Sequence, residues 1–310
     1  MNLRYYLAVK STFLMKYFSL LLILLICAST SLAQSLPIKP ELPFKIYDTK
    51  TGEQLTMTEL ADRVVRTDVV FWGEEHNDTI GHILELKMLK LLNERYSKKL
   101  VLSLEMFETD CQVLLDEYLG GFIAEEKFVK DARAWNNYED YRPMVEYAKE
   151  QKIPIIAANS PRRYNSMMSK RGPKTLDSLG SNSKDYIAKL PVYAPKSGAY
   201  YQKFVGIMGG ESNIHSPNMF ASQCLWDATM AKSIDRAVAN NKKDGVVMHV
   251  CGRFHSDEYL GTVAQLQRKD KDLKLLTISC FPADDFKKPD YESYEKLADY
   301  VILIKKTNAE

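Results

Sequence analysis

The chain of 310 residues is 45% hydrophobic and 26% charged, and its 42 basic and 40 acidic residues leave a formal net charge of +2. This balance gives no support to nucleic-acid binding, which depends on a clustered basic surface that neutralises phosphates. The hydrophobic content is sufficient for the core of one large α/β domain.

Residues 1–33 have the pattern of a secretory signal peptide. Three basic residues, Arg4, Lys10 and Lys16, precede the apolar run 20–26, and the segment contains no acidic residue. The apolar run is too short to span a bilayer comfortably. The order of a basic region followed by a short apolar region is typical of an export signal.

Small residues mark the end of this segment, because Ser31 and Ala33 occupy the positions that a signal peptidase reads. We therefore predict cleavage after Ala33 and a periplasmic or otherwise exported protein. A membrane-anchored lipoprotein that carries its lipid on Cys27 stays open as an alternative. Against it, the bulky Ile26 precedes this cysteine, where lipoprotein processing favours a small residue.

The remainder, 34–310, is predicted to be a single α/β domain. Four runs that are apolar at nearly every position indicate strands buried on both faces of a sheet: 68–72, 100–104, 153–157 and 245–250. A helical pattern that starts after Asn77 or Asp78 separates the first two runs, and this spacing produces a right-handed parallel crossover. A hairpin over 44–56 and strands over 273–279 and 299–304 complete a mostly parallel sheet flanked by helices.

Residues 162–222 interrupt this alternation. The segment contains several prolines and glycines and no strand-like run, so we predict a helical insertion. It is also rich in tyrosine and methionine. Composition alone is explained by packing of these side chains against the domain.

Polar residues follow each of the four central strands. Glu74 and His76 come after the first strand, Glu105 after the second, Arg163 after the third and His255 after the fourth. Ligands of open parallel sheets bind at the carboxyl ends of the strands, so we expect these residues to converge in one crevice. We predict all five as catalytic residues for acid/base chemistry, and Glu74, His76 and His255 also as ligands of a divalent metal. The alternative is an ion-pair network with Arg163 that only ties loops together.

Glycines and further histidines refine this picture. Gly73 and Gly252 are expected to let the backbone turn tightly before His76 and His255. His82 lies outside the spacing of a helical metal pair and either faces the crevice or lies on the helix surface. His249, inside an apolar strand, is expected to be a core residue.

Several chemistries lack their usual motifs in this chain. No G-x-S-x-G, G-x-G-x-x-G or P-loop sequence occurs, which removes the usual support for a serine hydrolase, a dinucleotide enzyme or a phosphate-loop enzyme. The cysteines form no C-x-x-C pair, so neither a zinc knuckle nor a redox pair is indicated. We expect most or all of the cysteines beyond Ala33 to be free thiols.

Five sequence elements together resemble the ChaN-like haem-binding uptake family. They are the G-x-x-H elements 73–76 and 252–255, the strand residue Glu105, the turn 157–162 and the helix 223–231. The same superfamily is similar to the Tiki proteases and the erythromycin esterases, which share the G-x-x-H and Glu elements at a hydrolytic site. The chain departs from the usual pattern at Arg253 and Phe254, where smaller residues are typical, and at Cys251, which precedes Gly252.

The resemblance implies an exported protein that binds haem and serves iron uptake, with haem as its partner. It also implies that the insertion contacts the haem and supplies a tyrosinate ligand, for which Tyr200 and Tyr201 are the candidates. Met208 and His215 are the alternative ligands. A homodimer stays open.

Two other functions stay open from the sequence. A metal-dependent hydrolase, esterase-like or protease-like, would use the two G-x-x-H elements and Glu105 to bind a cation or activate water. A binding module with a vestigial site would need neither haem nor a metal. The sequence therefore leaves undecided whether the protein is an enzyme.

Overall fold

Residues 43–96, 99–241 and 245–306 are described in this computed structural model. The predicted signal peptide, its cleavage site at Ala33 and Cys27 lie outside the described residues. The part of the chain from Pro43 onward forms one compact unit. Within the described residues, no helix combines the length and the apolar character that crossing a membrane requires.

The apolar runs of the sequence become strands of one sheet. Among the described residues the sheet has eight strands: β1 Phe44–Asp48, β2 Gln54–Leu55, β3 Val69–Glu74, β4 Leu100–Glu108, β5 Ile155–Asn159, β6 Val246–Gly252, β7 Leu275–Ala283 and β8 Tyr300–Lys305. Their order across the sheet is β2-β1-β8-β7-β3-β6-β4-β5. All neighbours from β8 to β5 are parallel, and β1 is antiparallel to both β2 and β8. The prediction of a mostly parallel sheet is therefore confirmed.

The register of the central strands brings their carboxyl ends to one level. Glu74 of β3 lies opposite Gly252 of β6, and Leu104 of β4 lies opposite Val250. Glu105 therefore follows at the same edge as the two G-x-x-H elements. Polar residues that are far apart in the sequence meet there because the strands that carry them are parallel neighbours.

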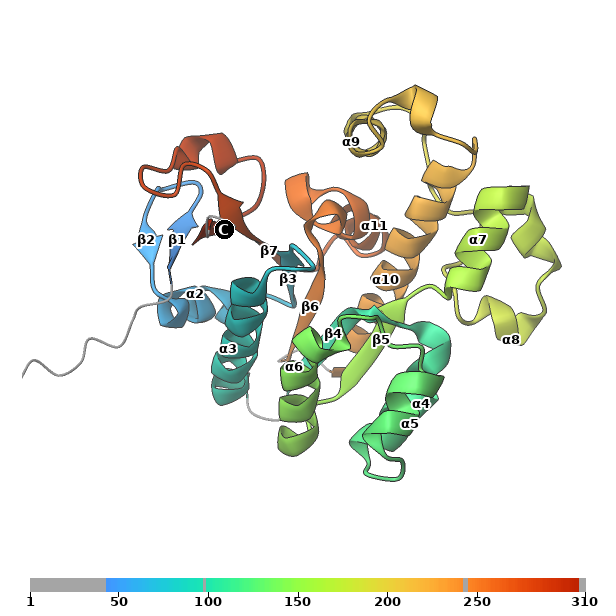
Figure 1. Cartoon of the computed structure of the whole chain (residues 1–310), viewed down its shortest axis with the longest axis horizontal. Helices are drawn as coiled ribbons and strands as arrows, with labels where there is room; N and C mark the ends of the chain where they lie inside the picture. Colours follow the sequence, from blue (N-terminus) through green and yellow to red (C-terminus); the bar gives the residue numbers. More distant parts are fainter. Residues whose placement is uncertain (1–42, 97–98, 242–244, 307–310) are drawn as a thin grey trace, which may run out of the picture. The chain divides into compact units, whose positions relative to one another are not determined.

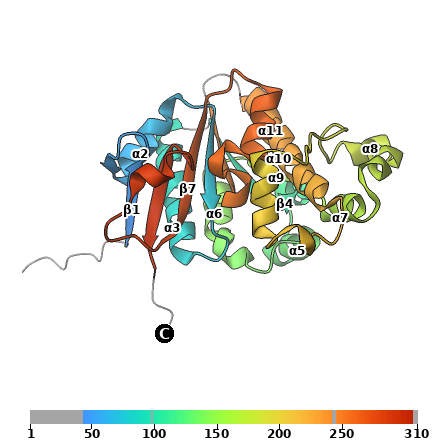
Figure 2. The same cartoon turned by 90° about the horizontal axis from the view of Figure 1, so that it is seen from above.

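Helices cover both faces of the sheet, with α3 and α6 on one side and α10 and α11 on the other (Figures 1 and 2). Their bounds are α2 Met57–Arg63, α3 Thr79–Tyr96, α4 Gln112–Leu119, α5 Glu125–Asp131, α6 Tyr138–Gln151, α7 Arg162–Arg171, α8 Ser181–Lys184, α9 Ala199–Ile207, α10 Met219–Asn241 and α11 Gly261–Lys269. Side chains alternate along a strand. Val69 and Phe71 of β3 thus pack with Ile234 of α10 and Val263 of α11, whereas Glu74 faces α3 and α6.

Residues 162–222 contain α7, α8, α9 and the first residues of α10, and no strand. Helix α7 packs against α10, and Figure 1 shows α7 and α8 on the far side of α10 from β3. The predicted end of the insertion at residue 222 falls inside α10, which already begins at Met219. The apolar residues Phe220 and Leu225 lie on the buried side of one continuous helix, so no break separates the insertion from the domain there.

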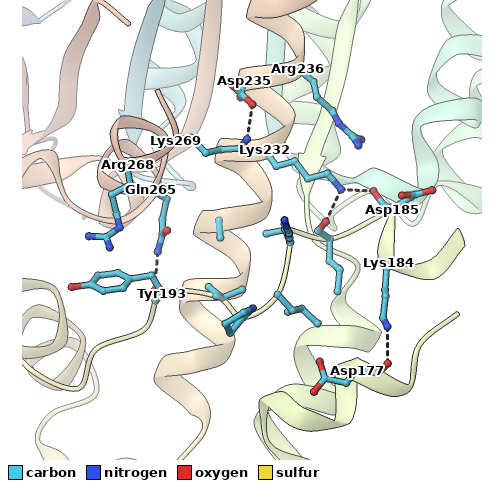
Figure 3. Close-up of a pocket in the computed structure, with 17 residues that line it drawn as sticks. Asp177, Lys184, Asp185, Tyr193, Lys232, Asp235, Arg236, Gln265, Arg268 and Lys269 are labelled. Carbon is cyan, nitrogen blue, oxygen red and sulfur yellow. Dashed lines mark hydrogen bonds and ion pairs between the residues drawn. The ribbon is translucent and has the colours of Figure 1, made fainter. Parts of the chain in front are cut away.

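A cleft of about 770 Å³ lies where the insertion meets α10 and α11 (Figure 3). At its wall, Lys232 Nζ donates hydrogen bonds to the backbone carbonyls of Asp185 and Ile187 at 2.7 and 2.6 Å. The guanidinium of Arg268 lies 3.4 Å from the ring centroid of Tyr193. These cationic side chains fasten the insertion to α10 and α11, which explains why they gather at this cleft.

Candidate functional site

Four of the five predicted catalytic residues meet at the carboxyl ends of β3, β4 and β6. Glu74, Glu105 and His255 are buried, and the side chain of His76 is 37% exposed. The side chains form two carboxylate–histidine pairs, one on each face of the sheet. His76 lies between them, close enough for both Glu74 and Glu105 to raise its pKa against the effect of burial.

His255 lies between two buried carboxylates. It ends a short 3₁₀ turn, Arg253–His255, that follows β6. Its Nδ1 lies 2.7 Å from Oδ1 of Asp227 on α10, and its Nε2 lies 3.4 Å from Oε1 of Glu105. The other oxygen of Glu105 accepts a hydrogen bond from the backbone N–H of Gly252 at 2.8 Å. The imidazole is thereby fixed in place from both sides.

Glu105 and His255 each stabilise the charged form of the other. Burial by itself lowers the pKa of His255, but Glu105 and Asp227 outweigh it and raise that pKa to about 10. Burial raises the pKa of Glu105, and the neighbouring His255 and His76 lower it to a net value below its ordinary range. An imidazolium between two carboxylates is therefore the stable form at neutral pH. Such a group can stabilise negative charge or donate a proton.

His76 pairs with Glu74 on the other side of the site. Its Nδ1 lies 2.7 Å from Glu74 Oε1, which also accepts a hydrogen bond from the Tyr141 hydroxyl at 2.8 Å. A Cβ added to Gly252 would lie 2.6 Å from His76 Nε2. The φ of Gly252 is −55°, which other residues also adopt. Glycine is required there for this close approach and not for a tight turn, which corrects the expectation from the sequence.

A cavity of about 490 Å³ opens above Glu105 and His255. Its lining combines polar groups with two tryptophans: Glu105, Glu108, Ala134, Trp135, Asn136, Asn137, Asn159, Ser160, Arg162, Trp226 and His255. This shape and chemistry suit a small polar or aromatic ligand, with a carboxylate and an imidazole at the base.

Arg163 does not lie in this cavity, contrary to the expectation from the sequence. Its guanidinium pairs with Asp110 and stacks on the ring of Tyr164 at 4.4 Å. The neighbouring Arg162 lines the cavity instead and pairs with Glu108. Adjacent residues at the start of a helix point in different directions, and the sequence did not show which arginine would face the site.

Two residues of the site were not predicted. Asp227 fixes His255, and Tyr141 donates to Glu74. Asp227 had a signal in the sequence, because it is the one acidic residue in 219–231, a segment of mostly apolar and small residues. The structure buries it fully. Tyr141 had no such signal, since it lies in a helix with many charged neighbours.

The predicted haem ligands lie on or near α9. The Tyr200 hydroxyl donates a hydrogen bond to Asp227 Oδ2 at 2.5 Å, so this tyrosine belongs to the network of His255. Tyr201 packs edge-on against Phe220, with ring centroids 5.1 Å apart. Met208 packs into the same apolar cluster, and His215 is exposed in the loop before α10.

The predicted metal ligands Glu74, His76 and His255 do not converge as one set. His76 Nδ1 turns to Glu74, while both nitrogens of His255 face Asp227 and Glu105. The described residues bring a different set together, in which Glu74, His82 and Glu85 place ligand atoms within 4.8 Å of one another. His82 is buried against the sheet and lies neither in the cavity nor on the helix surface.

Known proteins share this architecture. A model of the family described as haem-binding uptake, Tiki superfamily, ChaN matches residues 60–266. The chain belongs to this family. The resemblance drawn from the sequence motifs is thereby confirmed, and haem-related uptake is the general role of the family.

Solved structures add the fold of the relatives. The structure described as cofacial haem binding to ChaN of Campylobacter jejuni is 17% identical, with a TM-score of 0.64 over 85% of this chain and 97% of that chain. The type III effector HopBA1 is 13% identical (TM-score 0.44, 87% and 100% covered), and a Bacillus cereus protein is 10% identical (TM-score 0.48, 81% and 92% covered). At 17% identity, the likeness to the Campylobacter jejuni structure shows the fold alone. No curated protein matches the chain.

The pKa of His255 tests the geometry of the site. Replacing Asp227→Asn removes a carboxylate 2.7 Å from His255 Nδ1, so the pKa of His255 should fall below its value of about 10. A pH titration of the histidine ring signals by NMR measures this change. Asp235→Asn, on the same helix but paired with the exposed Lys269, is the matched control and should leave the pKa unchanged.

The same titration has a consequence for stability. The folded-state pKa of His255 lies above the ordinary value of 6.5. The charged imidazole therefore stabilises the folded state fully below pH 6.5, and this stabilisation is lost as the pH rises toward 10. The free energy of unfolding should therefore decline over that window, and less steeply in Asp227→Asn. An unchanged His255 pKa in the variant would contradict the proposed contact.

Proposed function

We propose that this protein binds haem on the surface of α9, with Tyr201 as the axial ligand to ferric iron. Membership of a haem-binding uptake family supports the ligand, and the apolar cluster around α9 supports the place. That cluster joins Phe204, Phe220 and Cys224 to partly exposed Tyr201 and Met208. Haem is a large flat apolar group, and a surface of aromatic and thioether side chains suits it.

Tyr201 is preferred to Tyr200 as the axial ligand because the two hydroxyl groups differ in their hydrogen-bond partners. The Tyr200 hydroxyl is committed to Asp227, and burial together with that carboxylate raises its pKa well above the ordinary value. A tyrosinate would have to form there next to a negative charge. Among the described residues, the Tyr201 hydroxyl has no hydrogen-bond partner, so it can approach iron without breaking one. This contrast is the observation that carries the proposal.

In this proposal Met208 assists Tyr201, and His215 is not a ligand. Met208 lies at the end of α9 in the same cluster, where its thioether can pack on the porphyrin. His215 is exposed in the loop between α9 and α10 and lies outside the apolar cluster. The Campylobacter jejuni protein is described with cofacial haems, so a homodimer that brings two haems together is part of this proposal.

Hemin titration followed by absorbance tests the ligand. The wild-type protein should give the spectrum of a high-spin ferric haem with one tyrosinate, and Tyr201→Phe should lose this spectrum and at least about tenfold in affinity, which is 1.4 kcal/mol. Tyr193→Phe is the matched control, because this tyrosine is also exposed in the insertion but lies under Arg268. The molecular mass with and without hemin reports on the homodimer.

The outcomes separate the candidate ligands. If Tyr200→Phe abolishes the tyrosinate spectrum while Tyr201→Phe keeps it, the assignment to Tyr201 is wrong. If hemin binds no better than to an unrelated protein, haem binding itself is rejected. Circular dichroism of each variant shows that a loss of binding is not a loss of fold.

The geometry around Glu105 favours hydrolysis as a second candidate function. Glu105 is buried, kept ionised by His255, and lines the cavity of about 490 Å³. A water bound there could give its proton to the carboxylate while the His255 imidazolium stabilises the oxyanion that develops on an ester or amide. Tyr200, Asp227, His255 and Glu105 form one connected series that would hold this imidazolium in place.

Glu105→Gln is the test of this second candidate. The amide keeps the shape but cannot take a proton, so cleavage of aryl esters or peptides should fall by about 10² or more. Glu258→Gln, an exposed carboxylate near the same edge, should cleave like the wild type. Equal rates for wild type and Glu105→Gln, or no cleavage above background, would reject a hydrolytic role for this site.

Export is also part of the proposal, since a protein for haem uptake acts where haem is met. The support is the basic, apolar and small-residue order of 1–33. The intact mass of protein recovered from the exporting cells should correspond to a chain that starts at Gln34. A diacylglyceryl adduct on Cys27 would show the lipoprotein alternative, and a full-length mass would contradict export by this signal.

A further inference from the structure

Three buried side chains converge on the α3 face of the sheet, close to His76. They include two carboxylates but only one nitrogen that can donate a hydrogen bond to them. Glu74 ends β3, and His82 and Glu85 lie one turn apart on α3. Their exposed fractions are 2%, 6% and 0%. His82 Nδ1 lies 3.2 Å from Glu74 Oε2 and 3.2 Å from Glu85 Oε2. Two carboxylates and one imidazole nitrogen thus share a site that water does not reach.

The other nitrogen of His82 fixes the tautomer. Nε2 lies 3.2 Å from the backbone carbonyl oxygen of His76, which can only accept a hydrogen bond. Nε2 therefore carries the hydrogen, and in a neutral imidazole the lone pair of Nδ1 points at the two carboxylates. Histidines that bind metals show this arrangement, in which the distal N–H donates to a carbonyl and orients the ring.

Two carboxylate oxygen atoms of these residues lack a hydrogen-bond partner in the described part of the chain. Glu74 Oε2 and Glu85 Oε1 are buried and have no hydrogen-bond partner among the described residues. Glu74 Oε2 is within ion-pair distance of His82 Nδ1, but a single proton on that nitrogen cannot be directed at both carboxylates at once. Without a cation, a second proton on one of the two carboxylates has to balance the remaining buried charge. A divalent cation would neutralise both carboxylates and contact one oxygen of each.

The surroundings hold Glu74 in the orientation that a ligand needs. Its other oxygen, Oε1, accepts a hydrogen bond from the Tyr141 hydroxyl at 2.8 Å and lies 2.7 Å from His76 Nδ1. Oε2 is thereby left for the site that His82 and Glu85 share. Residues around a ligand that orient it in this way are typical of built metal centres.

We propose that Glu74, His82 and Glu85 bind one divalent first-row transition-metal ion. Carboxylate oxygens and an imidazole nitrogen together suit zinc or manganese. The ion would join β3 to α3 and hold Glu74, and through it His76, at the carboxyl end of β3. This site is separate from α9 and does not depend on haem binding.

The experiment uses the full chain purified without chelator. Elemental analysis should find about one equivalent of zinc or manganese for each chain. After chelation, titration with Zn²⁺ or Mn²⁺ should restore one equivalent and raise the melting temperature, because the ion binds only the folded state. Substitution with Co²⁺ should give visible d–d absorption bands that report on a nitrogen and oxygen ligand set.

Glu85→Gln removes one ligand while keeping its shape, and it should weaken metal binding by more than about 100-fold. Glu75→Gln changes an exposed carboxylate on the adjacent turn and should bind like the wild type. If Glu85→Gln does not fold, the Co²⁺ spectrum of the wild-type chain still shows whether nitrogen and oxygen ligands bind the ion.

Three results would overturn the proposal. The first is a wild-type chain that holds no stoichiometric metal and shows no rise in melting temperature with either ion; two protons, on His82 and Glu85, then balance the buried charge. The second is wild-type affinity in folded Glu85→Gln. The third is loss of the metal in His255→Ala with retention in Glu85→Gln, which would restore the metal set expected from the sequence.

Discussion

The position of Glu74 at the last residue of β3 constrains most of the polar structure around it. A carboxylate that is 2% exposed must be compensated by hydrogen bonds or by positive charge. Burial raises the pKa of Glu74, but the neighbouring His76 and His82 outweigh it and bring that pKa to about 2. One oxygen of Glu74 thereby orients His76 at the carboxyl end of β3, and the other faces the site between β3 and α3.

A second buried carboxylate, Asp227, connects the cavity to the insertion. It contacts His255 through Oδ1 and Tyr200 through Oδ2, so α9 and the turn after β6 share one partner on α10. Tyr201, the proposed haem ligand, is the next residue along α9. If haem binding displaced α9, the hydrogen bonds from Tyr200 to Asp227 and from Asp227 to His255 would transmit the displacement to His255. The surface of α9 and the cavity at Glu105 are thus connected, although their chemistry differs.

The sequence predicted those parts that depend on local pattern. Continuous apolar runs identified the buried strands, and the parallel arrangement then placed Glu74, Glu105 and His255 at one edge. Of the two expected capping residues of α3, Asn77 and Asp78, it is Asp78 whose side chain accepts a hydrogen bond from the backbone N–H of Ile80. The four cysteines of the described residues are free and buried, in agreement with their apolar surroundings.

Other features could not be read from local pattern because they depend on which elements pack together. Tyr141 reaches Glu74 from α6, and Glu85 meets it from α3, and neither pairing has a fixed spacing in the sequence. The choice between Arg162 and Arg163 depended on the direction in which α7 starts. The role of Gly252 was assigned to its backbone freedom, whereas the structure shows that His76 occupies the space of a side chain.

The histidines His249 and His255 show how burial and contact decide between a core residue and a reactive one. Both are buried, and the charge of Glu105 raises the pKa of both. His249 lies 3.0 Å from the Ser103 hydroxyl and has no carboxylate within ion-pair distance among the described residues, so burial lowers its pKa to about 3. His255 has two carboxylates in contact, and its pKa rises to about 10. A more distant charge is not enough to keep a buried imidazole ionised, whereas direct contact is. The expected core role of His249 and the charged state of His255 therefore have one physical cause, and the difference arises because Glu105 and Asp227 both contact His255 directly.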